Sequence, residues 1–127
     1  VELLLDLPGQ EITIATDPTR LSQVINNLVN NAIKFTSEGN ICIGYRSATS
    51  NRVKIFVEDT GTGMAKEVIE HIFDRFYKTD LSRGKDKLGS GLGLAICREI
   101  INAHKQTIDV VSTVGVGSEF VFTLPKA

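Results

Sequence analysis

One stretch restricts the fold more than any other, because residues 17–36 have the pattern of a single capped amphipathic helix. Asp17 is a favourable N-cap, Pro18 suits the first helical position, and the Ser37-Glu38-Gly39-Asn40 turn ends the helix near Thr36. At about 100° per residue, the apolar side chains fall on one side of this helix. These are Leu21, Val24, Ile25, Leu28, Ala32 and Phe35. Such a stripe must be covered, so the helix requires a second layer of structure.

Period-two alternation and short turns supply that second layer. We predict strands over residues 1–7, 11–16, 40–47, 52–59, 107–113 and 117–125, and further helices over 65–73 and 91–104. Residues 77–90 have no apolar periodicity and predict a long mobile loop, which in a compact domain is usually functional. Because most strand neighbours are joined by short turns, the pattern predicts an α+β domain with a mixed sheet and helices on one face.

Composition limits the classes of partner. The chain has 127 residues, enough for one domain, and its 14 Lys and Arg nearly balance its 15 Asp and Glu. This balance argues against bulk attraction to nucleic acid or to a membrane surface. Cys42 and Cys97 lack metal-ligand spacing and are expected to be buried thiols. We expect a cytoplasmic piece of a longer protein, since the chain starts within a predicted strand and shows no signal-peptide pattern.

Four asparagines weaken the first helix. Asn26 and Asn30 fall nearly opposite the apolar stripe and are expected in solvent, whereas Asn27, Asn31 and Lys34 form a row along its edge. A half-buried row of two carboxamides and an ammonium must find partners. Carboxamide oxygens suit Mg²⁺ and a lysine suits phosphate, but hydrogen bonds to a neighbouring loop would explain the row equally well.

Two glycine-rich stretches favour the phosphate alternative. Asp59-Thr60-Gly61-Thr62-Gly63 places a carboxylate and a tight turn at the end of an apolar strand, a weak signal by itself. Gly89-Ser90-Gly91-Leu92-Gly93-Leu94 opens a helix, where backbone N–H groups can bind an anion. Neither the dinucleotide-binding fingerprint nor the GxxxxGK[ST] phosphate loop is present.

Five stretches in this order resemble the catalytic ATP-binding domain of bacterial sensor histidine kinases, in the superfamily of gyrase and of the heat-shock and mismatch-repair ATPases. LSQVINNLVNNAIKF is similar to the family's N box, VEDTGTGM to its first glycine box and IFDRFYKTD to its phenylalanine box. GSGLGLAI is similar to the second glycine box, and GVGSEFVFTLP to the closing segment. The resemblance covers the whole chain as one domain, 1–127, and implies the Bergerat fold, with about five strands on about three helices and a mobile ATP lid near 77–90.

The resemblance implies that the domain binds ATP with Mg²⁺. Asn31 would coordinate the metal, Asn27 would support the metal or the phosphates, and Lys34 would contact phosphate; these three would be the catalytic residues. Phe35 would pack on the adenine, and Asp59 would accept a hydrogen bond from its amino group. The remaining binding positions would be those in the glycine boxes, the lid and the closing segment, namely Gly61, Gly63, Lys78, Arg83, Gly89, Gly91, Leu92, Gly93, Leu94 and Ser118.

Individual roles differ among these positions. Gly61 and Gly63 would let the base and sugar approach the backbone, while the glycines of the second box would wrap the β and γ phosphates. Lys78 and Arg83 would face the phosphates from the lid, although solvated loop charge explains them equally well. Phe73 and Phe76 would anchor the near end of the lid, a role compatible with simple core packing.

The resemblance also bears on reaction type. Where the superfamily's ATPases and serine kinases carry a glutamate as general base, this chain has Asn27, so hydrolysis by the domain alone should be slow. The implied function is donation of the γ-phosphate to a histidine on a separate dimerisation domain of the parent protein, which then serves a response regulator. Neither His71 nor His104 lies in the acceptor context, and His104-Lys105-Gln106 replaces the relatives' His-Gly-Gly, which leaves the shape of that turn in question. The alternatives are a free-standing ATPase or serine kinase, and a degenerate nucleotide-binding module; the parent protein could be anchored in the inner membrane.

Overall fold

A single five-stranded sheet organises the molecule. The computed structural model describes residues 1–127 except 10, 15 and 76–92. The strands are β1 (Glu2–Asp6), β2 (Asn40–Thr49), β3 (Arg52–Asp59), β4 (Ile108–Thr113) and β5 (Gly117–Pro125), in the order β1-β2-β3-β5-β4. β1 runs parallel to β2, and every other neighbouring pair is antiparallel. This confirms the predicted mixed sheet, and most of its pairings are antiparallel.

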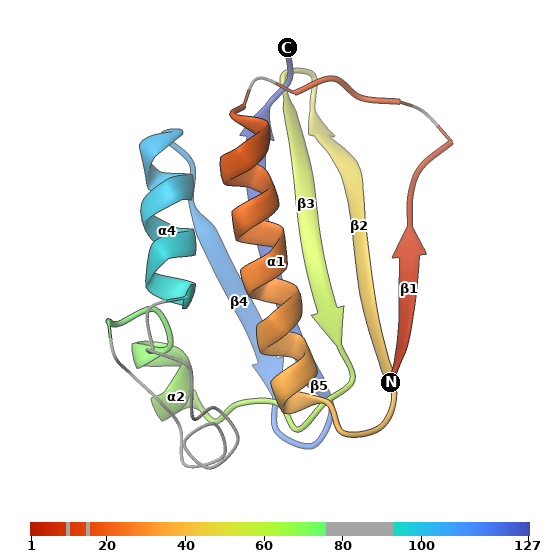
Figure 1. Cartoon of the computed structure of the whole chain (residues 1–127), viewed down its shortest axis with the longest axis vertical. Helices are drawn as coiled ribbons and strands as arrows, with labels where there is room; N and C mark the ends of the chain where they lie inside the picture. The colour runs from red at the N-terminus through yellow and green to blue at the C-terminus, as the bar shows by residue number, and fades with distance from the viewer. Residues whose placement is uncertain (10, 15, 76–92) are drawn as a thin grey trace.

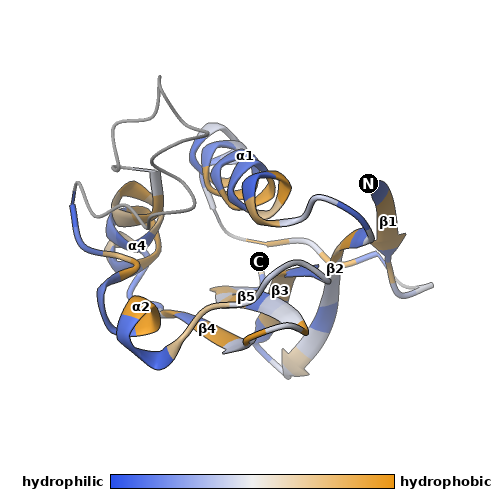
Figure 2. Ribbon diagram, turned by 90° about the horizontal axis from the view of Figure 1, so that it is seen from below, coloured by the Kyte–Doolittle hydropathy of each residue, from blue (hydrophilic) through white to orange (hydrophobic). Residues whose placement is uncertain are grey.

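Helices form the second layer. α1 (Pro18–Phe35) and α4 (Gly93–Ala103) lie side by side on one face of the sheet, while α2 (Lys66–His71) sits beside the end of β4 (Figures 1 and 2). α1 begins as predicted, because the Asp17 carboxylate accepts a hydrogen bond from the backbone N–H of Thr19 at 2.9 Å. The α+β two-layer architecture is therefore confirmed, with three helices in the described part of the chain.

The core lies between α1, α4 and the sheet. Val24 and Leu28 of α1 are fully buried, and they belong to one cluster with Val57 of β3 and Phe120 and Phe122 of β5. Leu21 and Ile25, at the margins of the predicted stripe, are half-buried. The apolar stripe predicted from helical periodicity therefore identifies the buried side of α1 correctly, because the sheet covers that side.

One predicted strand is wrong. Residues 11–14 and 16 form no strand, and their only sheet-like contact is an isolated bridge between Ile14 and Lys126. The segment passes across the end of the sheet on its way from β1 to α1 (Figure 1). Ile12 and Ile14 are half-buried against the core, so the alternation in EITIAT reflects packing of alternate side chains without a hydrogen-bonded ladder.

The turn after α4 keeps a regular shape without glycine. Lys105 adopts a left-handed conformation, with φ 59°. Its N–H donates to the carbonyl of Asn102 at 2.9 Å, and the N–H of Gln106 donates to that of Ile101 at 3.2 Å. These two bonds are the Schellman pattern, in which glycine normally occupies the place of Lys105. The turn therefore forms at the expense of backbone strain in Lys105.

The face of the sheet away from the helices carries an acidic pair. Glu58 of β3 stands directly opposite Glu119 of β5, and no described helix covers this side (Figure 2). Partial burial raises the pKa of Glu58, and the hydrogen bond and negative charge of Glu119 raise it further. In the described ranges, no helix is both long enough and apolar enough to cross a bilayer.

Candidate functional site

Asp59 is a buried carboxylate at the end of β3. Its side chain is 4% exposed and accepts a hydrogen bond from the N–H of Gly61 at 2.9 Å. Among the residues that the structure describes, no cation forms an ion pair with it. Burial raises the pKa of Asp59, while the N–H groups of Gly61 and Ser118 and the Thr36 hydroxyl act in the opposite direction. A carboxylate held in this way can accept a further hydrogen bond from a donor that enters from outside.

Asp59 belongs to a cluster that we call the buried polar cluster. It consists of Thr36, Asp59 and Ser118, which are buried, and Ser112, which is half-buried. Ser118 stands opposite Asp59 in the β3–β5 pairing, and its Oγ lies 2.7 Å from that of Ser112. Ser112 Oγ also donates to the carbonyl of Gly117 at 3.0 Å and accepts from the N–H of Met64 at 2.7 Å. Polar groups are thus concentrated at one end of an otherwise apolar core, as in a ligand site.

Thr36 and Ser112 were not predicted as part of this site. Thr36 entered the sequence interpretation only as the end of the first helix, and Ser112 only as a strand residue. In the structure, Thr36 is the C-cap of α1 and is 2% exposed. The available signal was its place directly after Phe35, at the end of the predicted helix.

The edge of α1 is arranged as predicted. Asn26 and Asn30 are exposed, whereas Asn27, Asn31 and Lys34 are half-buried. Asn27 Nδ2 donates to the carbonyl of Gly93 at 3.4 Å, which brings the edge of α1 against the start of α4. The row therefore runs from the beginning of α4 towards the C-terminal end of α1.

The turn after Asp59 packs tightly on the chain itself. Thr62 N–H donates to the carbonyl of Phe35 at 3.0 Å, and a Cβ at Gly61 would lie 2.2 Å from that same oxygen. Gly63 has φ +70°, and a Cβ there would lie 2.0 Å from the carbonyl oxygen of Thr113. Both glycines are therefore required by contacts within the protein. Their approach to a base and sugar stays a prediction.

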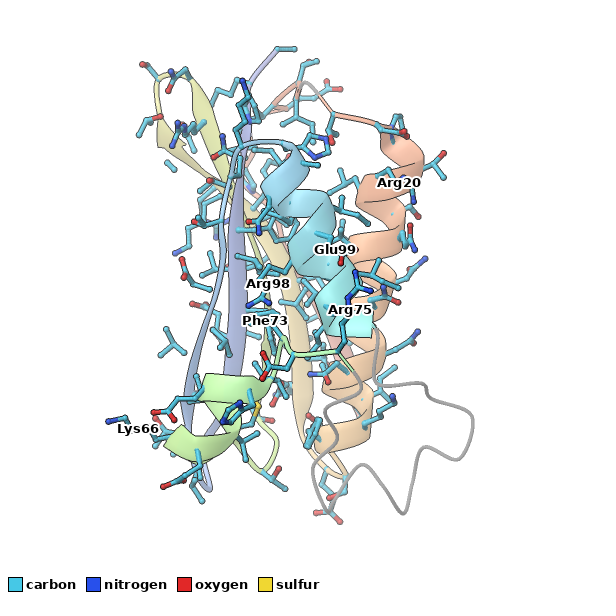
Figure 3. The ribbon with its side chains drawn as sticks, turned by 90° about the vertical axis from the view of Figure 1, so that its left-hand side faces the viewer. Arg20, Lys66, Phe73, Arg75, Arg98 and Glu99 are labelled. Atoms are coloured by element: carbon cyan, nitrogen blue, oxygen red, sulfur yellow. The ribbon has the colours of Figure 1, made fainter. Side chains whose placement is uncertain are left out.

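Phe35 and Phe73 are both buried in the structure. Phe35 is the last residue of α1 and is 8% exposed, next to the turn that follows Asp59. Phe73 packs edge-on against Phe120 with ring centroids 6.0 Å apart, and the Arg98 guanidinium lies 5.6 Å from its ring centre (Figure 3). Phe73 is thus a core residue, and its role in anchoring a lid stays a prediction.

Ion pairs and hydrogen bonds hold the residues around α2 and α4, including the two histidines. Arg75 pairs with Glu99 of α4, so the end of the segment after α2 is tied to that helix (Figure 3). His71 is an exposed residue of α2 and pairs with Asp74 at 2.8 Å. His104 is half-buried, and its Nε2 shares a hydrogen bond with the Thr16 hydroxyl at 2.9 Å.

The remaining predicted positions divide into two groups. Gly93 and Leu94 begin α4, and Leu94 packs against the core cluster. Outside the described residues lie Phe76, Lys78, Arg83, Gly89, Gly91 and Leu92. The described ranges contain no group of three or more His, Cys, Asp or Glu side chains able to hold a metal. The amide oxygens of Asn27 and Asn31 are the side-chain oxygens on the edge of α1 that could bind a hard cation.

Known proteins similar in sequence identify the family to which the chain is related. Residues 16–127 match the sequence profile of the family described as histidine kinase-, DNA gyrase B-, and HSP90-like ATPase. The chain is 44% identical over 111 residues to sensor protein SrrB of Staphylococcus aureus, and this match covers 87% of the chain. The same match covers 19% of SrrB, so the chain spans about a fifth of that relative's length.

Solved structures agree with the sequence match. Full-length ShkA, in a crystal structure with AMPPNP, superposes with a TM-score of 0.86 at 33% identity, over 99% of this chain and 26% of ShkA. The catalytic domain of histidine kinase ThkA superposes with a TM-score of 0.81 at 32% identity, over 98% of this chain and 80% of that domain. The arrangement of α1, the sheet and α4 is thus common to these proteins.

Proposed function

The chain belongs to the family of histidine kinase-, DNA gyrase B- and HSP90-like ATPases, and from this premise we propose that it binds Mg-ATP and donates the γ-phosphate to a histidine. The acceptor histidine would lie on a dimerisation domain of the same parent protein. A response regulator would then receive the phosphoryl group. The domain would be the catalytic part of a sensor histidine kinase.

The buried Asp59 is the observation that supports this proposal most directly. It is 4% exposed, accepts a hydrogen bond from the N–H of Gly61 at 2.9 Å, and forms no ion pair in the described part of the chain. A buried carboxylate without a counter-ion is costly unless another donor reaches it. The 6-amino group of adenine is such a donor, and Phe35 lies beside the same turn.

The half-buried edge of α1 would receive the phosphates. Asn31 would hold Mg²⁺ together with phosphate oxygens and water, and the bound ion would neutralise charge on the triphosphate. Lys34 would contact phosphate from the next turn of the same edge. Gly93 and Leu94 would contribute backbone from the start of α4, which Asn27 already contacts. The positions at 78, 83, 89, 91 and 92 are proposed on family resemblance alone.

Asn27 bears on the type of reaction. A carboxamide cannot take a proton near neutral pH, so no general base stands at this place to activate water. Phosphoryl transfer depends mainly on positioning and charge neutralisation, which the edge of α1 could provide. We therefore expect slow hydrolysis and efficient transfer to a supplied acceptor domain. Steady release of phosphate from the purified chain would instead favour a free-standing ATPase.

A matched pair of variants tests the nucleotide site. Asn31→Ala should abolish Mg²⁺-dependent binding of a fluorescent ATP analogue, because it removes the proposed metal ligand. Asn30→Ala should leave binding nearly unchanged, since Asn30 is the neighbouring, exposed residue of the same helix. Both variants lose the same chemical group and gain similar helix propensity, so any effect on helix stability is shared. Equal binding by the two variants would refute the proposed role of the helix edge.

A further inference from the structure

One buried hydroxyl beside Asp59 makes no hydrogen bond of normal geometry with the part of the chain that the structure describes. Thr36 is 2% exposed, and its Oγ1 finds no hydrogen-bond partner at normal geometry among the described residues. A buried hydroxyl that makes no hydrogen bond costs free energy, so native proteins rarely keep one. The other hydroxyls of the buried polar cluster differ, since Ser112 and Ser118 bond to each other at 2.7 Å. Thr36 is therefore the member of the cluster whose hydroxyl lacks a well-formed hydrogen bond in the described ranges and could donate to an incoming acceptor.

Thr36 Oγ1 lies beside the turn that holds Asp59. A Cβ placed on Gly61 would come within 2.7 Å of Thr36 Oγ1, and the N–H of the same Gly61 is bonded to the Asp59 carboxylate at 2.9 Å. The hydroxyl is close enough to Asp59 to favour the ionised form of that carboxyl. Thr36 and Asp59 are also buried to nearly the same degree. The end of α1 and the end of β3 thus place a hydrogen-bond donor beside an acceptor.

This pair matches one edge of one purine. Adenine presents a donor, its 6-amino group, beside an acceptor, N1, and so needs an acceptor and a donor side by side. Guanine presents the reverse arrangement, with O6 as acceptor and N1–H as donor. Resting on the proposed function, we infer that the Thr36 hydroxyl donates a hydrogen bond to N1 of adenine while Asp59 accepts one from the amino group. Thr36 is then a second residue that selects adenine over guanine.

Nucleotide analogues that differ at single ring atoms test this contact. Binding of ATP, 1-deaza-ATP and 7-deaza-ATP is measured with Mg²⁺ for the wild-type chain, Thr36→Val and Thr36→Ser. The wild type should bind 1-deaza-ATP about tenfold more weakly than ATP, because the analogue has C–H in place of N1. Thr36→Val should lose about tenfold in ATP affinity and bind ATP and 1-deaza-ATP equally. Thr36→Ser should keep the wild-type ratio, and 7-deaza-ATP should behave as ATP in all three proteins.

The stability of the free protein separates this role from a structural one. Valine has the shape of threonine and suits its extended backbone, with φ −121° and ψ 98°. Without nucleotide, Thr36→Val should therefore melt at the wild-type temperature or above, since it removes a buried unpaired hydroxyl. A lower melting temperature with an unchanged ratio of ATP to 1-deaza-ATP affinity would overturn the inference. If the wild-type chain binds no nucleotide, the proposed function itself fails, a result visible before any variant is compared.

Discussion

Replacing Lys105 with glycine should stabilise the protein, although the change removes a whole side chain. Lys105 has φ 59° in the Schellman turn after α4. Its side chain is exposed, so the substitution leaves no cavity. An L-residue in the left-handed region costs about 1–2 kcal/mol, whereas glycine adopts this region without steric penalty. The gain is reduced by the greater conformational freedom of glycine in the unfolded chain, which costs about 0.5–1 kcal/mol.

From the midpoints of these ranges, the expected net gain from the backbone is about 0.7 kcal/mol, or about 3 °C in Tm for a domain of this size. Urea unfolding followed by circular dichroism measures this difference. Lys105→Ala is the proper reference, because it also loses the ammonium near the end of α4 but keeps the strained φ. Ala103→Gly serves as the opposite control, since Ala103 is an exposed helical residue where glycine should cost about 1 kcal/mol. A Lys105→Gly protein no more stable than Lys105→Ala would refute the claim that strain is stored in this turn.

Three further outcomes follow from the same structure. Because burial raises the pKa of Asp59, the stability of the fold should decline as pH rises from below the ordinary value of 3.8 through the raised folded pKa. Asp59→Asn should abolish that decline in urea titrations between pH 3 and 7. The same variant should weaken ATP binding at least tenfold. Glu119→Gln should raise stability by about 0.5 kcal/mol at pH 7, because it relieves repulsion of the ionised Glu58. The gain should be smaller at pH 3, because the raised pKa of Glu58 favours its neutral form there; an equal gain at both pH values would contradict this. Gly61→Ala should lower the free energy of unfolding by more than about 2 kcal/mol, since the new methyl group meets a backbone carbonyl at 2.2 Å. Gly115→Ala, with open space at φ +80°, should lower it by only about 1 kcal/mol. Similar losses in the two unfolding curves would show that the contact at Gly61 relaxes.

Local patterns in the sequence were sufficient for most of the fold. The cap at Asp17, the stripe through Val24 and Leu28, and the exposed Asn26 and Asn30 all follow from helical periodicity, and each is found in the structure. The strands were found in the same way, except at 11–16. Alternation there reports which side chains are buried, and it does not report whether a neighbouring backbone is available for pairing.

The tertiary structure alone decided which residues surround Asp59. Thr36, Asp59 and the hairpin that carries Ser112 and Ser118 come from three segments far apart in the chain, and the meeting of Thr36 with Asp59 depends on the end of α1 packing on the turn after β3. The same packing shows that Gly61 has no room for a side chain. The periodicity of apolar residues extends over a few positions, so it can be recognised in the sequence alone. An unpaired hydroxyl or a filled space beside a glycine is a property of contacts between distant segments, and it exists only once those segments have packed together.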